Sequence, residues 1–125
     1  MRESTKTSTK LIRKGEPGAL RSLASRSGVS VSALASVIGI PKRALARRQN
    51  AGRLGSEKSE RLLRIAVIVE KILDLFEGDR DAASRWLTTP RKALDRRSPL
   101  DCSRTEIGAR KIENLIGQLQ HGIFP

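Results

Sequence analysis

The chain has 125 residues, of which 38% are hydrophobic and 30% charged, and its net charge is +12. This length fits one compact domain or two small subdomains that share a core. No apolar run approaches the roughly 20 residues needed to span a bilayer. The first residues lack the apolar core of a signal peptide, and the single cysteine, Cys102, cannot form an intramolecular disulfide. We therefore expect a cytoplasmic protein.

The positive charge is concentrated in the first half of the chain. Residues 1–60 hold 13 Lys and Arg against 4 Asp and Glu, a net charge of +9, whereas residues 61–125 hold 12 against 9, a net charge of +3. Such an excess attracts polyanions, and nucleic acid is the usual one. The alternative is a solubilising surface or a basic tail. Residues 1–15 are rich in Ser, Thr and Lys and are expected to form a flexible basic arm, which either stays loose or contacts the DNA backbone.

Aliphatic residues recur at helical spacing along the chain, which predicts an all-α fold. Three helices are predicted in the first half, at about 18–27, 31–38 and 41–49. Ser30 has the side chain to cap the second helix, and Gly39 turns the chain before the third. The residues expected to face inward are Leu20, Leu23, Ala24, Leu34, Ala35, Ile38, Ile40, Ala44 and Leu45.

The second and third helices, joined by a tight glycine turn, match a helix-turn-helix motif. In this motif the second helix of the pair lies in the major groove, and its N-terminal half faces the base edges. Arg can read guanine and Gln can read adenine through paired hydrogen bonds. The candidate DNA-binding residues are therefore Lys42, Arg43, Arg47, Arg48 and Gln49. A core residue is expected where Arg48 stands, so either Arg48 points outward or this helix is rotated. A helix pair that serves only as a scaffold is the alternative.

The longest helix of the chain is predicted between Ser56 and Gly78. Its apolar residues recur at intervals of three and four, so it is expected to form a spine that joins the two halves. Glu57 lies in the first turn, where a carboxylate favours the helix dipole. The predicted inner face consists of Leu62, Ile65, Val69, Ile72, Leu73 and Phe76.

Shorter helices are predicted after this spine. One has Asp79 as its cap and ends before Pro90. The last helix ends at Gly122, and Ser103 with Glu106 matches a capping box at its start. The residues expected to face inward on these two helices are Ala82, Ala83, Trp86, Leu87, Ile107, Ile112, Leu115, Ile116 and Leu119.

Five short segments in the second half point to a known family. They are "SERLLR", "AASRWL", "SPLD", "TEIGARKIENLIGQL" and "HGIFP", in this order. On these segments the chain resembles, over roughly residues 18–125, the Xre/MbcA/ParS-type antitoxins, which are bacterial proteins with an Xre-like helix-turn-helix and a C-terminal toxin-binding domain. The chain departs from the family pattern after Leu94, where glycine is usual, and after Asp101, where aliphatic residues are usual.

The resemblance implies a division of the chain and a function. It implies a helix-turn-helix DNA-binding region (16–55) and a small helical toxin-binding and dimerisation domain (56–125), which follow the flexible basic arm (1–15) expected from composition. The implied function is that of a type II antitoxin, which covers the active site of a RES-domain toxin that consumes NAD and binds operator DNA to repress its own operon. The neutralising candidates on this chain are Leu119, His121, Gly122, Ile123, Phe124 and Pro125.

The residues themselves leave other readings open. Exposed Ile123 and Phe124 would be unfavourable unless a partner covers them, although they could also fold back on their own core. A homodimer is expected, because two DNA half-sites require two recognition helices. Neither Cys102 nor His121 has companions for a metal site, and no nucleophile or base stands in a recognisable catalytic set, so we expect no cofactor, no metal and no enzymatic activity. A stand-alone helix-turn-helix regulator without a toxin is the alternative, and a pure interaction protein is a third possibility.

Overall fold

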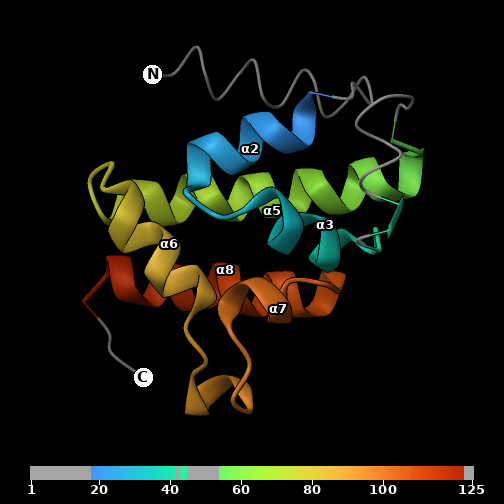
Figure 1. Cartoon of the computed structure of the whole chain (residues 1–125). Helices are drawn as coiled ribbons and strands as arrows, with labels where there is room; N and C mark the ends of the chain where they lie inside the picture. Colours follow the sequence, from blue (N-terminus) through green and yellow to red (C-terminus); the bar gives the residue numbers. More distant parts are fainter. Residues whose placement is uncertain (1–17, 42, 45–53, 123–125) are drawn as a thin grey trace.

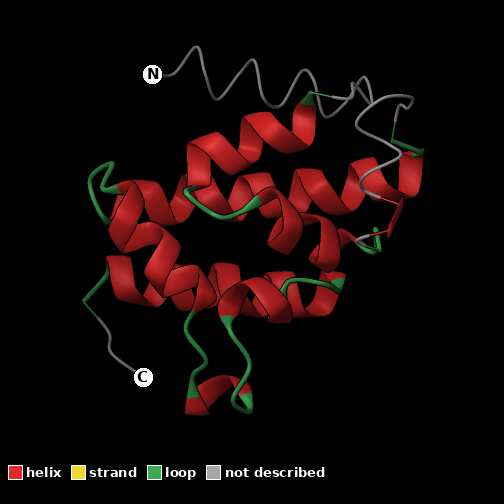
Figure 2. Cartoon of the chain, viewed as in Figure 1, coloured by secondary structure: helices red, strands yellow, loops and turns green. Residues whose placement is uncertain are grey.

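The computed structural model describes residues 18–41, 43–44 and 54–122. Within these ranges the chain is helical and forms no strand, and its β-type pairing is an isolated bridge between Arg91 and Arg97 (Figure 2). The predicted all-α fold is thereby confirmed. The helices are α2 (Ala19–Ser27), α3 (Val31–Ile38), α5 (Ser56–Leu75), α6 (Arg80–Thr88), η1 (Lys92–Leu94), α7 (Pro99–Cys102) and α8 (Glu106–Gln120).

The predicted helix starts agree with the structure at two caps. The Ser30 hydroxyl accepts a hydrogen bond from the Ala33 N–H at 3.0 Å and so caps α3. Asp79 caps α6 in the same way, because its carboxylate accepts from the Ala82 N–H at 3.1 Å. Each cap satisfies one of the backbone donors that the first turn of a helix leaves without a partner.

The start of α8 differs from the prediction. Ser103 is buried and closes α7, where its hydroxyl donates to the Pro99 carbonyl at 2.8 Å. The cap of α8 is Thr105, whose hydroxyl accepts from the Gly108 N–H at 3.0 Å. The capping box assigned to Ser103 and Glu106 was therefore wrong. Helix α7 extends through Cys102, and Ser103 follows it directly as its C-cap. The last helix therefore begins after the next hydroxyl residue whose backbone is extended, Thr105.

Helix α5 lies at the centre of the molecule. Figure 1 shows α2 on one side of α5 and α8 on the other, with α3 and α6 packed across it. Seven of its residues are buried, including Ala66 and Ile68, so this helix buries a broad apolar face. The buried side chains of all the larger helices join in one hydrophobic core, as expected for a helix that acts as a spine.

The inner faces were predicted correctly for most helices, and Trp86 lies in the core with 8% of its surface exposed. Ile107 is the clear exception, because 82% of its surface is exposed. It stands five residues before the fully buried Ile112, which places it about 140° away around an α-helix of 3.6 residues per turn. Since α8 faces α5 through Ile112 and Ile116, Ile107 points away from the core.

The half-buried residues pack around the edge of this core. Ala24, Ala44, Phe76, Leu115 and Leu119 were expected inside, and each lies against the core with part of its surface exposed. Ala82 is also half-buried, whereas Leu45 lies outside the described residues. None of the described helices has both the length and the apolar character that crossing a membrane requires.

Candidate functional site

Helix α3 ends in a tight turn at Gly39. Gly39 adopts φ 91°, a left-handed conformation that glycine enters without steric strain. The Ile40 N–H donates to the Ala35 carbonyl at 2.8 Å, and the Ile40 side chain is buried at 2% exposure. This turn redirects the chain toward Arg43 and Ala44, whose backbone is helical. The first helix and the turn of the predicted helix-turn-helix are therefore present.

Three basic side chains from outside the motif hold the end of α3. Lys58 Nζ donates to the Gly39 carbonyl at 2.9 Å, and the Arg61 guanidinium donates to the Ile38 carbonyl at 3.2 Å. The Arg104 guanidinium donates to the Ser36 carbonyl at 3.1 Å. The last carbonyls of a helix lack partners within it, and cations are favoured at this negative end of the dipole. The Ser36 carbonyl also accepts from the Gly39 N–H at 3.2 Å.

The three cations were not identified from the sequence. They come from α5 and from the turn before α8, and α3 has no basic residue in its own last turn. They also give a second reason for glycine at position 39, besides its positive φ. An added Cβ would lie 2.9 Å from the Arg61 guanidinium and 3.0 Å from Lys58 Nζ. Of the sequence signals, only the basic residues near the start of α5 could have indicated such contacts.

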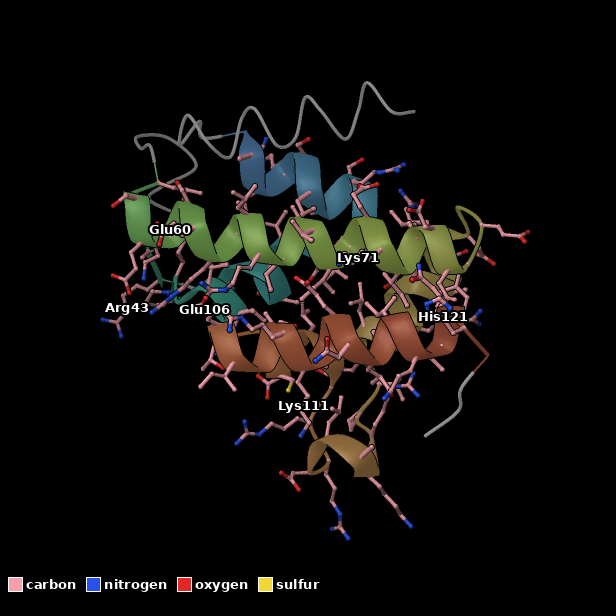
Figure 3. The ribbon with its side chains drawn as sticks, turned by 180° about the vertical axis from the view of Figure 1, so that it is seen from behind. Arg43, Glu60, Lys71, Glu106, Lys111 and His121 are labelled. Carbon is pink, nitrogen blue, oxygen red and sulfur yellow. The ribbon has the colours of Figure 1, made fainter. Side chains whose placement is uncertain are left out.

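The structure describes one of the five candidate DNA-binding residues. Arg43 is exposed and lies at an edge of the molecule, as labelled in Figure 3. Lys42, Arg47, Arg48 and Gln49 lie outside the described residues. Next to Arg43 in sequence is a surface hollow of about 440 Å³, lined by Ser32, Ser36, Gly39, Ile40 and Pro41. The hydroxyls of Ser32 and Ser36 and the exposed guanidinium of Arg43 are groups that suit contact with an anionic backbone.

The candidate toxin-binding residues begin at the end of α8. Leu119 is half-buried and packs against the core, whereas His121 and Gly122 are exposed. The His121 N–H donates to the Gly117 and Gln118 carbonyls, each at 3.2 Å, and closes the helix. Residues 123–125 lie outside the described part of the chain. In the part that is described, no three His, Cys, Asp or Glu side chains are grouped to hold a metal ion.

The helix-turn-helix region is tied to the second half by polar contacts as well as by the core. Arg26 on α2 forms a bidentate ion pair with Glu70 on α5. The Arg80 guanidinium donates to the Ser25 carbonyl at 2.9 Å, and the Ser84 hydroxyl donates to the Gly28 carbonyl at 3.2 Å. The end of α2 is therefore held against both α5 and α6.

Comparison with known proteins places both halves of the chain in one family. Residues 8–67 match the model of the antitoxin Xre-like helix-turn-helix domain, and residues 73–122 match the model of the antitoxin Xre/MbcA/ParS C-terminal toxin-binding domain. Between them these matches include the α3 turn, the three cations around it, and the whole of α8 with the two residues that follow it.

Two curated relatives carry the name "Antitoxin Xre". The protein from Yersinia enterocolitica is 45% identical over 87 residues, which cover 69% of this chain and 59% of the relative. The protein from Photorhabdus laumondii is 35% identical over 88 residues, which cover 70% of this chain and 60% of the relative. The matched part of the chain thus spans about three-fifths of each relative's length. On these matches and on its helical fold, the chain belongs to the Xre/MbcA/ParS family of antitoxins.

Proposed function

We propose that this protein is the antitoxin of a type II toxin–antitoxin pair, which binds and neutralises a cognate toxin and also binds operator DNA. The observation that carries this proposal is the match of residues 73–122 to a toxin-binding domain in the same chain as a matched helix-turn-helix domain. The toxin is of the RES type and consumes NAD, as the family resemblance implies. Binding to its own operator represses the operon.

The DNA-binding half of the proposal is supported by the geometry of the α3 turn. Gly39 directs the chain from α3 into the segment that holds Arg43, and the Arg43 side chain is exposed. We assign the DNA contacts to Lys42, Arg43, Arg47, Arg48 and Gln49. A homodimer would present two such segments to half-sites that lie about 34–36 Å apart, one turn of the double helix.

The neutralising half of the proposal rests on the end of α8. His121 and Gly122, the last two described residues, are both exposed. We propose that the toxin's active site is covered by Leu119, His121, Gly122, Ile123, Phe124 and Pro125. Leu119 would act mainly by positioning this segment, since it packs against the core.

The proposed function is tested by co-purification with the protein encoded by the adjacent gene. Two forms are compared, the full chain and a chain that ends at His121. We expect the full chain to hold the neighbouring protein and suppress its toxicity, and the shortened chain to lose both effects while keeping the same helical circular dichroism. Arg85→Ala, a change at an exposed residue of α6, serves as the control that should bind normally.

A stand-alone regulator is the alternative, and the same experiment separates the two. If neither form holds the neighbouring protein while the full chain still binds the promoter DNA of its operon, the antitoxin assignment is wrong and the regulator is correct. If the shortened chain neutralises as well as the full chain, the toxin-binding domain acts through other residues, and the assignment of Gly122 to Pro125 fails.

A further inference from the structure

A second basic segment, residues 91–97, leaves the body of the molecule between α6 and α7. From here on this segment, and not residues 1–15, is called the basic arm. Its two ends are joined, because the Arg91 N–H donates to the Arg97 carbonyl at 3.1 Å and the Arg96 N–H donates to the Arg91 carbonyl at 2.9 Å. Between them lies the single turn of η1. Figure 1 shows the arm projecting away from α2 and α5, and Figure 3 shows the same projection from behind.

The basic arm is anchored to the body of the molecule at two points. Leu94 is buried, with 3% of its surface exposed, and belongs to the hydrophobic core. The Arg91 guanidinium lies 5.0 Å from the centroid of the Trp86 ring, within the range of a cation–π contact. These contacts, with the bridge between the two ends, give the arm one defined position.

The outer surface of the arm carries cations that pair with no carboxylate of the described residues. Four basic residues and Asp95 give the seven residues a net charge of +3. The side chains of Lys92, Arg96 and Arg97 are exposed, and none of the three forms an ion pair with the described residues. Such side chains remain available to an anionic partner.

The tip of the arm also keeps a charged residue where glycine would be easier to accommodate. Asp95 has φ 54° and Arg96 has φ 65°, both in the left-handed region that side chains other than glycine disfavour. Backbone strain of this kind persists where the surrounding structure holds it in place. The Arg96 guanidinium, at this strained position, forms no hydrogen bond and no ion pair with the described residues.

We propose that the basic arm docks on an acidic surface of the toxin. This inference rests on the proposed function and names a second contact surface in addition to the end of α8. The arm lies within residues 73–122, the part that matches a toxin-binding domain. It projects from a different part of the molecule than the edge that holds Arg43. Exposed cations at the rim of an interface mainly raise the association rate and make binding salt-dependent.

The test uses the full chain and the protein encoded by the adjacent gene. The arm variant combines Lys92→Ser, Arg96→Gly and Arg97→Ser. The control variant combines Arg21→Ser, Arg85→Ser and Lys111→Ser, which removes the same charge from exposed positions outside the arm. Association rates and Kd are measured at about 50 and about 300 mM salt, since screening separates steering by charge from other contacts.

We expect the arm variant to associate roughly 10-fold more slowly at low salt and to lose most of its salt dependence, as the removal of steering charges predicts. The control variant should stay within about twofold of the wild type. Arg96→Gly alone should raise the Tm while it weakens binding, because glycine relieves the left-handed backbone. A purely structural role of Arg96 would instead lower Tm and binding together.

The remaining outcomes overturn the inference in distinguishable ways. If the wild type and the arm variant bind the neighbouring protein equally, with equal salt dependence, the arm does not dock on the toxin and the proposed function stands. If the control variant loses as much as the arm variant, only net charge matters and the arm is not a docking surface. If the arm variant loses promoter DNA and keeps the toxin, the arm binds nucleic acid. If the wild type does not bind the neighbouring protein, both proposals fail.

Discussion

Arg26 on α2 and Glu70 on α5 form a bidentate ion pair, with N···O distances of 2.9 and 2.8 Å. About a quarter of each side chain is exposed, so solvent screens the pair only in part. The hydrogen bond with Glu70 raises the pKa of the Arg26 guanidinium above its ordinary value, against the lowering effect of burial. The pair joins the helix before the motif to the central helix, 44 residues further along the chain.

Glu70→Gln should lower the free energy of unfolding by about 1 kcal/mol, because it replaces a charge-assisted pair at a partly buried site. Urea unfolding at neutral pH measures the change. Glu113→Gln is the matched control, since Glu113 pairs with Lys71 at 3.3 Å in a more exposed position and should change stability by less than about 0.5 kcal/mol. Equal effects of the two substitutions would contradict the special role of the Arg26 pair.

Because the pKa of Arg26 is raised, its contribution to the free energy of unfolding should not depend on pH near neutrality. A group whose folded pKa lies above its unfolded value contributes stability below the unfolded pKa and loses it only as pH rises through the folded pKa. For a guanidinium this window lies in strong alkali. The difference between wild type and Arg26→Ala should therefore remain constant between about pH 6 and pH 9. A difference that shrinks across this range would show that another group controls the pair.

Gly108 and Gly117 on α8 should respond in opposite directions to alanine. A Cβ at Gly108 would lie 1.8 Å from the Cys102 carbonyl oxygen, which is backbone and cannot move aside easily. Gly108→Ala should lower the free energy of unfolding by about 3 kcal/mol, at the upper end of overpacking effects. Gly117 has no atom within 4 Å of an added Cβ, so Gly117→Ala should raise stability by about 0.5–1 kcal/mol through helix propensity. Thermal or urea unfolding checks both, and two changes of the same sign would reject the packing of α7 on α8.

Ile107 and Ile112 provide a direct check on which face of α8 is buried. Ile112 is fully buried, so Ile112→Ala should cost about 2–5 kcal/mol through lost burial and a cavity. Ile107→Ala should change stability by no more than about 0.5 kcal/mol, because its side chain is largely exposed. Both substitutions remove the same atoms, so the difference between them measures position alone. Comparable losses at the two positions would place Ile107 inside an interface.

Arg43→Ala should weaken binding to operator DNA and reduce the slope of log K against log salt by about 1, if the guanidinium contacts a phosphate. A contact to a base edge would instead relax sequence preference and cost about 1–3 kcal/mol. Filter binding or fluorescence anisotropy over a salt series measures both quantities. Arg85→Ala, at an exposed position on α6, is the control that should leave the slope unchanged. If Arg43→Ala also leaves it unchanged and affinity is kept, Arg43 does not contact DNA.

Much of the fold could be read from local patterns in the sequence. The boundaries of α2, α3 and α6, the caps at Ser30 and Asp79, and the turn at Gly39 depend on residues within a few positions of one another. Amphipathic spacing also identified most of the core, since one face of each helix must be apolar. The assignments of Lys42, Arg43, Arg47, Arg48 and Gln49 to DNA, and of Leu119 and residues 121–125 to the toxin, stay predictions.

Only the tertiary structure decided which long-range partners complete these elements. Lys58, Arg61 and Arg104 reach the last carbonyls of α3 from 19 to 68 residues away, and no local pattern encodes that distance. The way α8 docks on α5 exposes Ile107, and the close approach of α7 makes Gly108 necessary. The sequence by itself determined the helices and their apolar faces because those follow from neighbours along the chain. The mutual orientation of the helices followed only from how those faces pack together. The same packing brings the three cations to the turn at Gly39 and makes the basic arm project.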